Sequence, residues 1–66
     1  MKIRLNGDPH ELAAPMTVLQ LLEQLGIDPR IVAVEHNLTI VKRDRYGSAM
    51  IGEGDEVEIV RFVGGG

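Results

Sequence analysis

Residues 17–26 have the sequence Thr-Val-Leu-Gln-Leu-Leu-Glu-Gln-Leu-Gly, which predicts an α-helix. Thr17 and Gln20 have the spacing of a capping box, in which the Thr hydroxyl accepts a hydrogen bond from an early helix amide and the Gln side chain returns to the cap. Gly26 supplies a left-handed cap at the C-terminal end. The apolar side chains recur at helical spacing and form one stripe, made of Val18, Leu21, Leu22 and Leu25. This helix is therefore expected to bury one face.

The residues before the helix predict a β-hairpin. Residues 2–6 alternate between polar and apolar side chains, which is the period of a half-buried strand. Asn6-Gly7 favours a tight turn, and the following Pro9 leaves open a loop of more than two residues. The return strand is expected over residues 10–14, with Leu12 facing the core.

The residues after the helix predict further strands, over residues 31–34, 38–41 and 56–63. Turns are expected at residues 35–37 and 52–55, and residues 42–46 form a charged crossover with one helical turn near Tyr46. This order of elements is typical of the β-grasp fold, an α+β fold in which a mixed sheet of four to five strands packs on one main helix. The helical crossover allows the first and last strands to pair in parallel at the centre of the sheet. The expected core comprises Ile3, Leu5, Val18, Leu22, Leu25, Val57 and Ile59.

Composition limits the classes of protein that are compatible with this chain. With 66 residues, 44% of them hydrophobic, we expect one β-grasp domain over residues 1–63 and a flexible glycine tail at residues 64–66. The net charge of −3 argues against binding to a nucleic acid backbone. The absence of cysteine agrees with a reducing compartment. Because residues 1–5 alternate and lack the apolar run of a signal peptide or membrane helix, we expect a cytoplasmic protein with no membrane association.

Polar side chains do not form a recognisable catalytic set. His10 and His36 are far apart and lack ligand spacing, so no metal site is expected and both are placed in surface turns. The basic run at residues 42–45 is interpreted as a solvated loop, with a salt-dependent contact to an acidic partner as the alternative. There is no phosphate-binding loop, catalytic triad or pair of catalytic carboxylates. The chain is therefore expected to be a substrate or carrier, not an enzyme.

Three glycines, residues 64–66, end the sequence, and composition alone leaves open that they are a frayed end or a cloning remnant. The functional interpretation is that an enzyme transfers AMP onto the carboxyl group of Gly66, because glycine has no Cβ and can pass through a narrow channel. The period of the last strand places Val60 and Phe62 on the face away from the core. They either form an exposed patch that docks a partner or are covered by a neighbouring loop.

Four segments carry a family resemblance: Met-Lys-Ile-Arg-Leu-Asn-Gly at residues 1–7, Thr-Val-Leu-Gln-Leu-Leu at 17–22, Val-Ala-Val-Glu-His-Asn at 32–37 and Gly-Glu-Gly-Asp-Glu-Val-Glu-Ile-Val-Arg-Phe-Val-Gly-Gly-Gly at 52–66. Through these segments, in this order, the sequence resembles the ThiS family of sulfur carriers over nearly its whole length. Ubiquitin and the small subunit of molybdopterin synthase share a terminal Gly-Gly, so the strand that leads into the tail favours ThiS. Lys42 departs from the family, whose members often have Pro at the matching position, and this affects the expected crossover.

The resemblance implies a ubiquitin-like fold and a role in making the thiazole ring of thiamine. It implies that a ThiF-like adenylyltransferase consumes ATP to adenylate Gly66, that a sulfur-donor system converts the adenylate to a thiocarboxylate, and that a ThiG-like thiazole synthase receives the sulfur. The chain itself would bind no cofactor. Gly64 and Gly65, with Val60 and Phe62, are the expected partner contacts. The alternatives are a carrier for molybdopterin synthesis, a ubiquitin-like protein modifier, and a plain binding module in which the glycines are inert.

Overall fold

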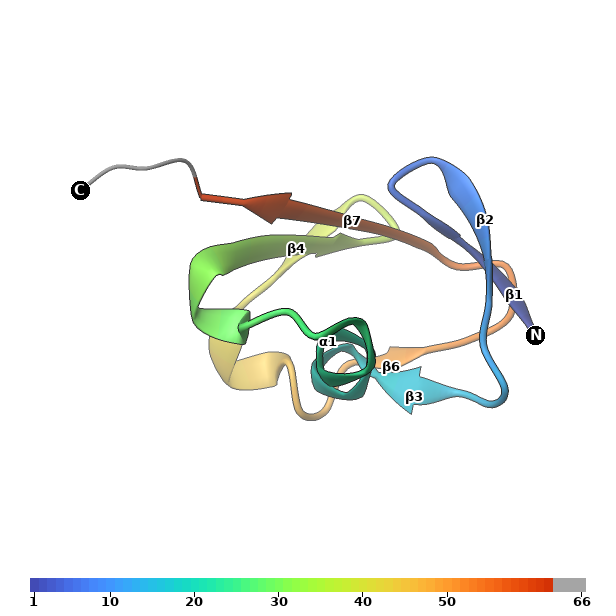
Figure 1. The fold of residues 1–66 in the computed structure, drawn as a ribbon, viewed down its shortest axis with the longest axis horizontal. Helices are drawn as coiled ribbons and strands as arrows, with labels where there is room; N and C mark the ends of the chain where they lie inside the picture. The colour runs from blue at the N-terminus through green and yellow to red at the C-terminus, as the bar shows by residue number, and fades with distance from the viewer. Residues whose placement is uncertain (63–66) are drawn as a thin grey trace.

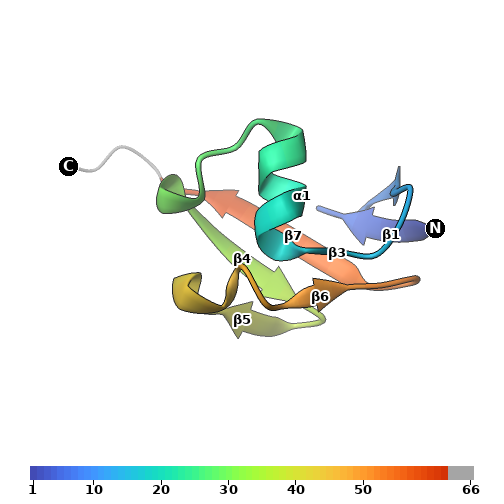
Figure 2. The same ribbon diagram turned by 90° about the horizontal axis from the view of Figure 1, so that it is seen from below.

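The computed structural model describes residues 1–62, which form a five-stranded mixed sheet with a helix packed across one face (Figures 1 and 2). The sheet order is β2-β1-β7-β4-β5. In chain order the elements are β1 (Lys2–Leu5), β2 (Asp8–Glu11), β3 (Met16–Thr17), α1 (Val18–Leu25), the 3₁₀ turn η1 (Pro29–Ile31), β4 (Val32–His36), β5 (Thr39–Val41), the 3₁₀ turn η2 (Arg43–Arg45), β6 (Met50–Ile51) and β7 (Glu56–Arg61). This arrangement is the expected β-grasp architecture.

Strand β7 lies at the centre of the sheet, as predicted. On one side it pairs in parallel with β1, where Leu5 is opposite Val57. On the other side it pairs antiparallel with β4, where Ala33 is opposite Val60. The crossover through α1 makes the parallel pairing possible. The last strand is thus held on both sides over its first half.

The first hairpin has the tight turn that Asn6-Gly7 predicted. Leu5 pairs with Asp8, so the loop contains two residues, Asn6 and Gly7, both with positive φ. The return strand therefore starts earlier than residues 10–14. The longer loop that Pro9 left open does not form, because Pro9 occupies an edge strand opposite Arg4, whose amide donates instead to Asp55 O at 2.9 Å. At such a non-hydrogen-bonded position proline removes no hydrogen bond between the two strands, although it lacks an N–H group.

The second hairpin and a small additional sheet also differ from the expectation. Strand β4 continues through His36, and its turn is made by Asn37 and Leu38, both with positive φ, so the predicted turn over residues 35–37 was placed too early. Residues 16–17 and 50–51 pair as strands β3 and β6, which were not predicted from the sequence. Two residues are too few to show a strand period.

Helix α1 and the core follow the predicted pattern closely. The Thr17 Oγ1 accepts from the Gln20 amide at 3.1 Å, and the Thr17 amide donates to Gln20 Oε1 at 2.9 Å, which confirms the capping box. Gly26 ends the helix at φ 71°. The buried hydrophobic side chains are Ile3, Leu12, Val18, Leu21, Leu22, Val32, Val34, Tyr46, Ile51 and Val57. Leu5, Leu25 and Ile59 were expected in this core but are only partly buried, because they line its edge.

Candidate functional site: the end of strand β7

The side chains of Val60 and Phe62 are exposed, with 59% and 55% of their area accessible. Their neighbours in β7, Val57 and Ile59, face the core or its edge. The Phe62 amide donates to Ile31 O at 2.9 Å, which holds the backbone in line with β4 up to the last described residue. The predicted outward orientation is therefore confirmed, and no loop within residues 1–62 covers either side chain.

Other apolar side chains share this face of the sheet. Ala33 pairs with Val60, and Ile40, which is 72% exposed, pairs with Glu35 on the same face. We call the set Ala33, Ile40, Val60 and Phe62 the outer patch. Glu35 and its partner on β7, Glu58, are both exposed and add acidic groups to the same face. Ala33 and Ile40 were not predicted as part of this surface, because only the strand register places them on the same face as Val60.

The glycine tail follows the outer patch directly in sequence. Gly64, Gly65 and Gly66 lie outside the described residues, as does Val63, with which the last strand was expected to end. In the structure β7 ends at Arg61. Phe62 is the last described residue, so four residues separate the outer patch from the end of the sequence. An enzyme that docks on the outer patch would therefore be close to the tail.

A polar cluster around Asp55 fixes the opposite end of β7. The carboxylate accepts hydrogen bonds from the Gly52 amide at 2.8 Å and from His36 Nε2 at 2.7 Å. Burial raises the pKa of Asp55, but the hydrogen bonds from Gly52, His36 and Asn37 outweigh it, so the pKa lies below its ordinary value. His10 lies in β2 and His36 in β4, so the expectation of surface turns was wrong for both. The cluster ties the end of β4 to the turn that starts β7.

The lowered pKa of Asp55 predicts a loss of stability in acid. Its stabilising contribution is present above the unfolded-state pKa of about 3.9 and disappears as the pH falls through the folded-state value. We expect Asp55→Asn to lower the free energy of unfolding by about 1 kcal/mol at pH 7 and to flatten its decline between pH 5 and pH 3. Urea unfolding across this range measures both effects. Asp44→Asn, at an exposed turn, is the control and should leave the pH profile unchanged.

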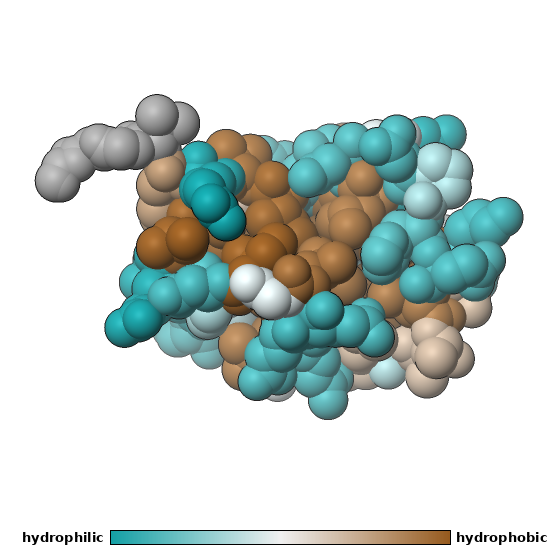
Figure 3. Space-filling model, in the orientation of Figure 1, coloured by the Kyte–Doolittle hydropathy of each residue, from teal (hydrophilic) through white to brown (hydrophobic). Residues whose placement is uncertain are grey.

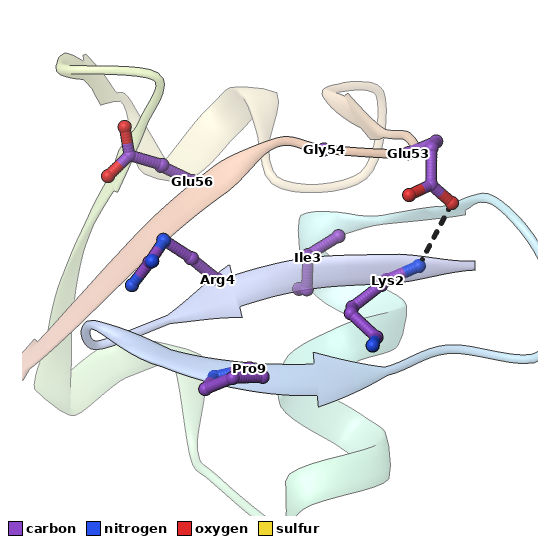
Figure 4. A pocket seen from close by; sticks show the side chains of 7 residues that line it. All are labelled: Lys2, Ile3, Arg4, Pro9, Glu53, Gly54 and Glu56. Carbon is purple, nitrogen blue, oxygen red and sulfur yellow. Dashed lines mark hydrogen bonds between the residues drawn. The ribbon is translucent and has the colours of Figure 1, made fainter.

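Two grooves mark the surface of residues 1–62. The larger one, of about 390 Å³, lies at the start of β1 and β7 (Figure 4). Its lining is mostly charged: Lys2, Ile3, Arg4, Pro9, Glu53, Gly54 and Glu56. The Lys2 amide donates to Glu53 Oε1 at 3.0 Å. The second groove, of about 300 Å³, is mostly apolar and is lined by Leu5, Asn6, Leu25, Ile27, Val32, Ile59 and Arg61. We call it the β7 groove. Neither lining contains a histidine or a hydroxyl nucleophile.

The described part of the chain lacks two further features. Residues 1–62 contain no group of three or more His, Cys, Asp or Glu side chains that could hold a metal ion. No helix in that range is long and apolar enough to cross a membrane.

Comparisons with known proteins place this geometry in a family. The family model described as "ThiS family" matches residues 3–66. The sulfur carrier protein ThiS of Escherichia coli is 32% identical over the full length of both chains, and that of Bacillus subtilis is 40% identical over 76% of each chain. The crystal structure of a thiamine biosynthesis protein, ThiS, from Geobacter metallireducens has a TM-score of 0.88 at 32% identity and is covered completely.

A second kind of relative contains a segment that is similar to this chain. The thiazole synthases of Paramagnetospirillum magneticum and Magnetococcus marinus are each 48% identical to it over all 66 residues. The chain spans only 20% of the length of either synthase. A segment similar to the whole chain is thus present within proteins named for thiazole synthesis.

Proposed function

Because the chain belongs to the ThiS family, we propose that it is a sulfur carrier protein of thiamine biosynthesis. The observation that carries the proposal is the exposed pair Val60 and Phe62 at the end of β7, directly before the glycines. A plain structural domain gains nothing from large apolar side chains in water, whereas a carrier needs a surface that its enzymes recognise. The match to the carrier of Escherichia coli over both full lengths supports the same role.

The proposed chemistry takes place on the carboxyl group of Gly66. A ThiF-like adenylyltransferase transfers AMP from ATP to this carboxylate, forming an acyl adenylate and releasing pyrophosphate. A sulfur-donor system then supplies a sulfur nucleophile at the oxidation level of sulfide, its electron pair forms the C–S bond, AMP departs with the electrons of the broken C–O bond, and a thiocarboxylate remains. Thiazole synthase receives this sulfur. The chain is a substrate in each step, not an enzyme, and ATP is bound by the partner.

The glycines suit this role because they lack a Cβ. An enclosed active site that acts on a chain end must admit the last residues through a channel, where any side chain adds width. Gly64, Gly65 and Gly66 would occupy that channel while the outer patch remains outside it. In this proposal β7 connects the docking surface directly to the reacting group.

Mass spectrometry of the intact protein tests the proposal. The chain is incubated with ATP, its cognate adenylyltransferase and a sulfur source, and we expect one oxygen to be replaced by one sulfur at the C-terminus. A chain that never makes this exchange would contradict the proposal. A ladder of conjugates in cells would instead indicate a ubiquitin-like modifier. A thiocarboxylate that supplies molybdopterin synthesis but not thiazole synthase would indicate the other sulfur-carrier pathway.

A further inference from the structure

The second half of β7 has a free backbone edge. Strand β1 accompanies β7 only as far as the pair Leu5 and Val57, and its hairpin turns back there (Figure 1). Even-numbered residues of β7 direct their backbone groups to β4, as the Phe62 amide shows, so odd-numbered residues direct theirs to the β1 side. Within residues 1–62, the Ile59 carbonyl and the Arg61 amide have no hydrogen-bond partner on that side.

Asn6 marks the point where the ladder stops. Its amide donates to Val57 O at 2.9 Å, and its side-chain Oδ1 accepts from the Ile59 amide at 2.7 Å. The side chain thus replaces the backbone carbonyl that a continuing parallel strand would supply, because the positive φ of Asn6 turns the main chain away. If another chain continued the parallel ladder, one of its residues would fill the next position. The amide of that residue would donate to Ile59 O, and its carbonyl would accept from the Arg61 amide.

The β7 groove lies beside this free edge. It is formed by apolar side chains from β1, β4, β7, the end of α1 and the loop that follows it, notably the partly buried Leu25, Ile27 and Ile59. Figure 3 shows a broad hydrophobic surface on this side of the molecule, between the sheet and α1. Arg61 lines the same groove, is exposed and forms no salt bridge with residues 1–62.

We propose that the edge of β7 at residues 59–61 binds an extended segment of thiazole synthase, which adds a strand to the sheet in line with β1. One residue of that segment would pair opposite Val60, and its neighbours would point to the inner face, an apolar one into the β7 groove and an acidic one towards Arg61. Strand addition of this kind gives affinity through main-chain hydrogen bonds and specificity through alternate side chains.

Thiazole synthase is the partner that the comparisons favour, and this inference rests on the proposed function. In two thiazole synthases a segment similar to this chain is part of the same polypeptide. Residues 63–66 extend at most about 14 Å, so a synthase that acts on Gly66 must place its own surface close to Phe62. The free edge of residues 59–61 lies within this reach.

Amide hydrogen exchange of the isotope-labelled carrier, free and in complex with full-length cognate thiazole synthase, tests the inference. We expect the Arg61 amide to exchange rapidly in the free protein and at least about tenfold more slowly in the complex. The Val60 amide, which faces β4, should be protected in both states. An Arg61 amide that exchanges equally fast in both states would overturn the inference. Protection by the adenylyltransferase alone would also overturn it, because the occupant would be the wrong enzyme.

Two substitutions of Arg61 distinguish the contribution of its backbone hydrogen bond from that of its side-chain charge. Arg61→Pro removes an amide hydrogen that makes no bond within residues 1–62, so it should weaken synthase binding about tenfold more than Arg61→Ala, which keeps that hydrogen. Glu11→Pro, on the exposed edge strand β2, is the control and should leave binding unchanged. Equal affinities of the two Arg61 variants would contradict strand addition.

The experiments distinguish a failure of strand addition from a failure of the sulfur-carrier proposal. If the thiocarboxylate forms but Arg61 is not protected by the synthase, only strand addition is wrong. If no thiocarboxylate forms, the sulfur-carrier proposal is wrong, whatever the exchange of the Arg61 amide. A carrier without residues 65–66 should still show protection at Arg61, because the paired edge ends before the tail.

Discussion

A chain that stops at Gly64 is expected to form neither an adenylate nor a thiocarboxylate, whatever the concentration of its enzymes. Removing Gly65 and Gly66 shortens the maximum reach of the chain end by about 7 Å, so the new carboxylate cannot reach an active site that accepts Gly66. The fold should be unaffected, because the buried side chains lie between Ile3 and Val57. ATP–pyrophosphate exchange and mass spectrometry measure the loss, and urea unfolding checks the fold.

A full-length chain whose terminal carboxylate is converted to an amide is the matched control for this truncation. It keeps the length of the tail but lacks the reacting oxygen, so it should bind the adenylyltransferase normally and give no adenylate. A truncated chain that keeps its function would contradict both carboxyl-activation hypotheses and favour the plain binding module. Formation of a thiocarboxylate at Gly64 would show that the enzymes do not require the length of the tail.

The helix and the centre of the sheet could be predicted because their signals are local. Thr17, Gln20 and Gly26 act within a few residues of one another, and the structure confirms each role. The parallel pairing of the first and last strands follows from the order of elements alone. By contrast, Pro9 can lie within a strand only because its backbone nitrogen does not point towards β1, the neighbouring strand. The sequence around the turn does not show which backbone amides point that way. Tyr46 is similar, since its hydroxyl donates to Val32 O at 3.2 Å across the fold.

The candidate site also has some residues that could be predicted from local sequence and others that could not. A strand period is sufficient to place Val60 and Phe62 on the outer face, and their exposure agrees. Ile40 joins them only through the register of β4 with β5, which depends on the turn at Asn37 and Leu38. The free amide of Arg61 is also invisible in the sequence, because it exists only where β1 ends beside β7. A surface formed by several strands could therefore be identified only from the structure, which gives the register between them.

Phe62→Asp should weaken docking to the adenylyltransferase by about 10- to 100-fold while the protein stays folded. The substitution places a charge within the outer patch, where an aromatic side chain is expected to be the anchor of the interface, and such anchors contribute about 1.4–2.8 kcal/mol to binding. Because the side chain is 55% exposed, the free energy of unfolding should change by no more than about 0.5 kcal/mol. Calorimetric titration with the enzyme and urea unfolding of the variant measure the two quantities.

Two further variants decide whether the effect of Phe62→Asp belongs to the outer patch. Phe62→Leu keeps an apolar side chain and should retain most of the affinity, whereas Ala13→Asp adds the same charge at an exposed loop residue and should have no effect. If Ala13→Asp weakened docking as much as Phe62→Asp, net charge would be the cause. If Phe62→Asp left docking intact, the adenylyltransferase would have to recognise another face, and the free edge at Arg61 would be the next surface to test, since it lies on the same strand and equally close to the tail.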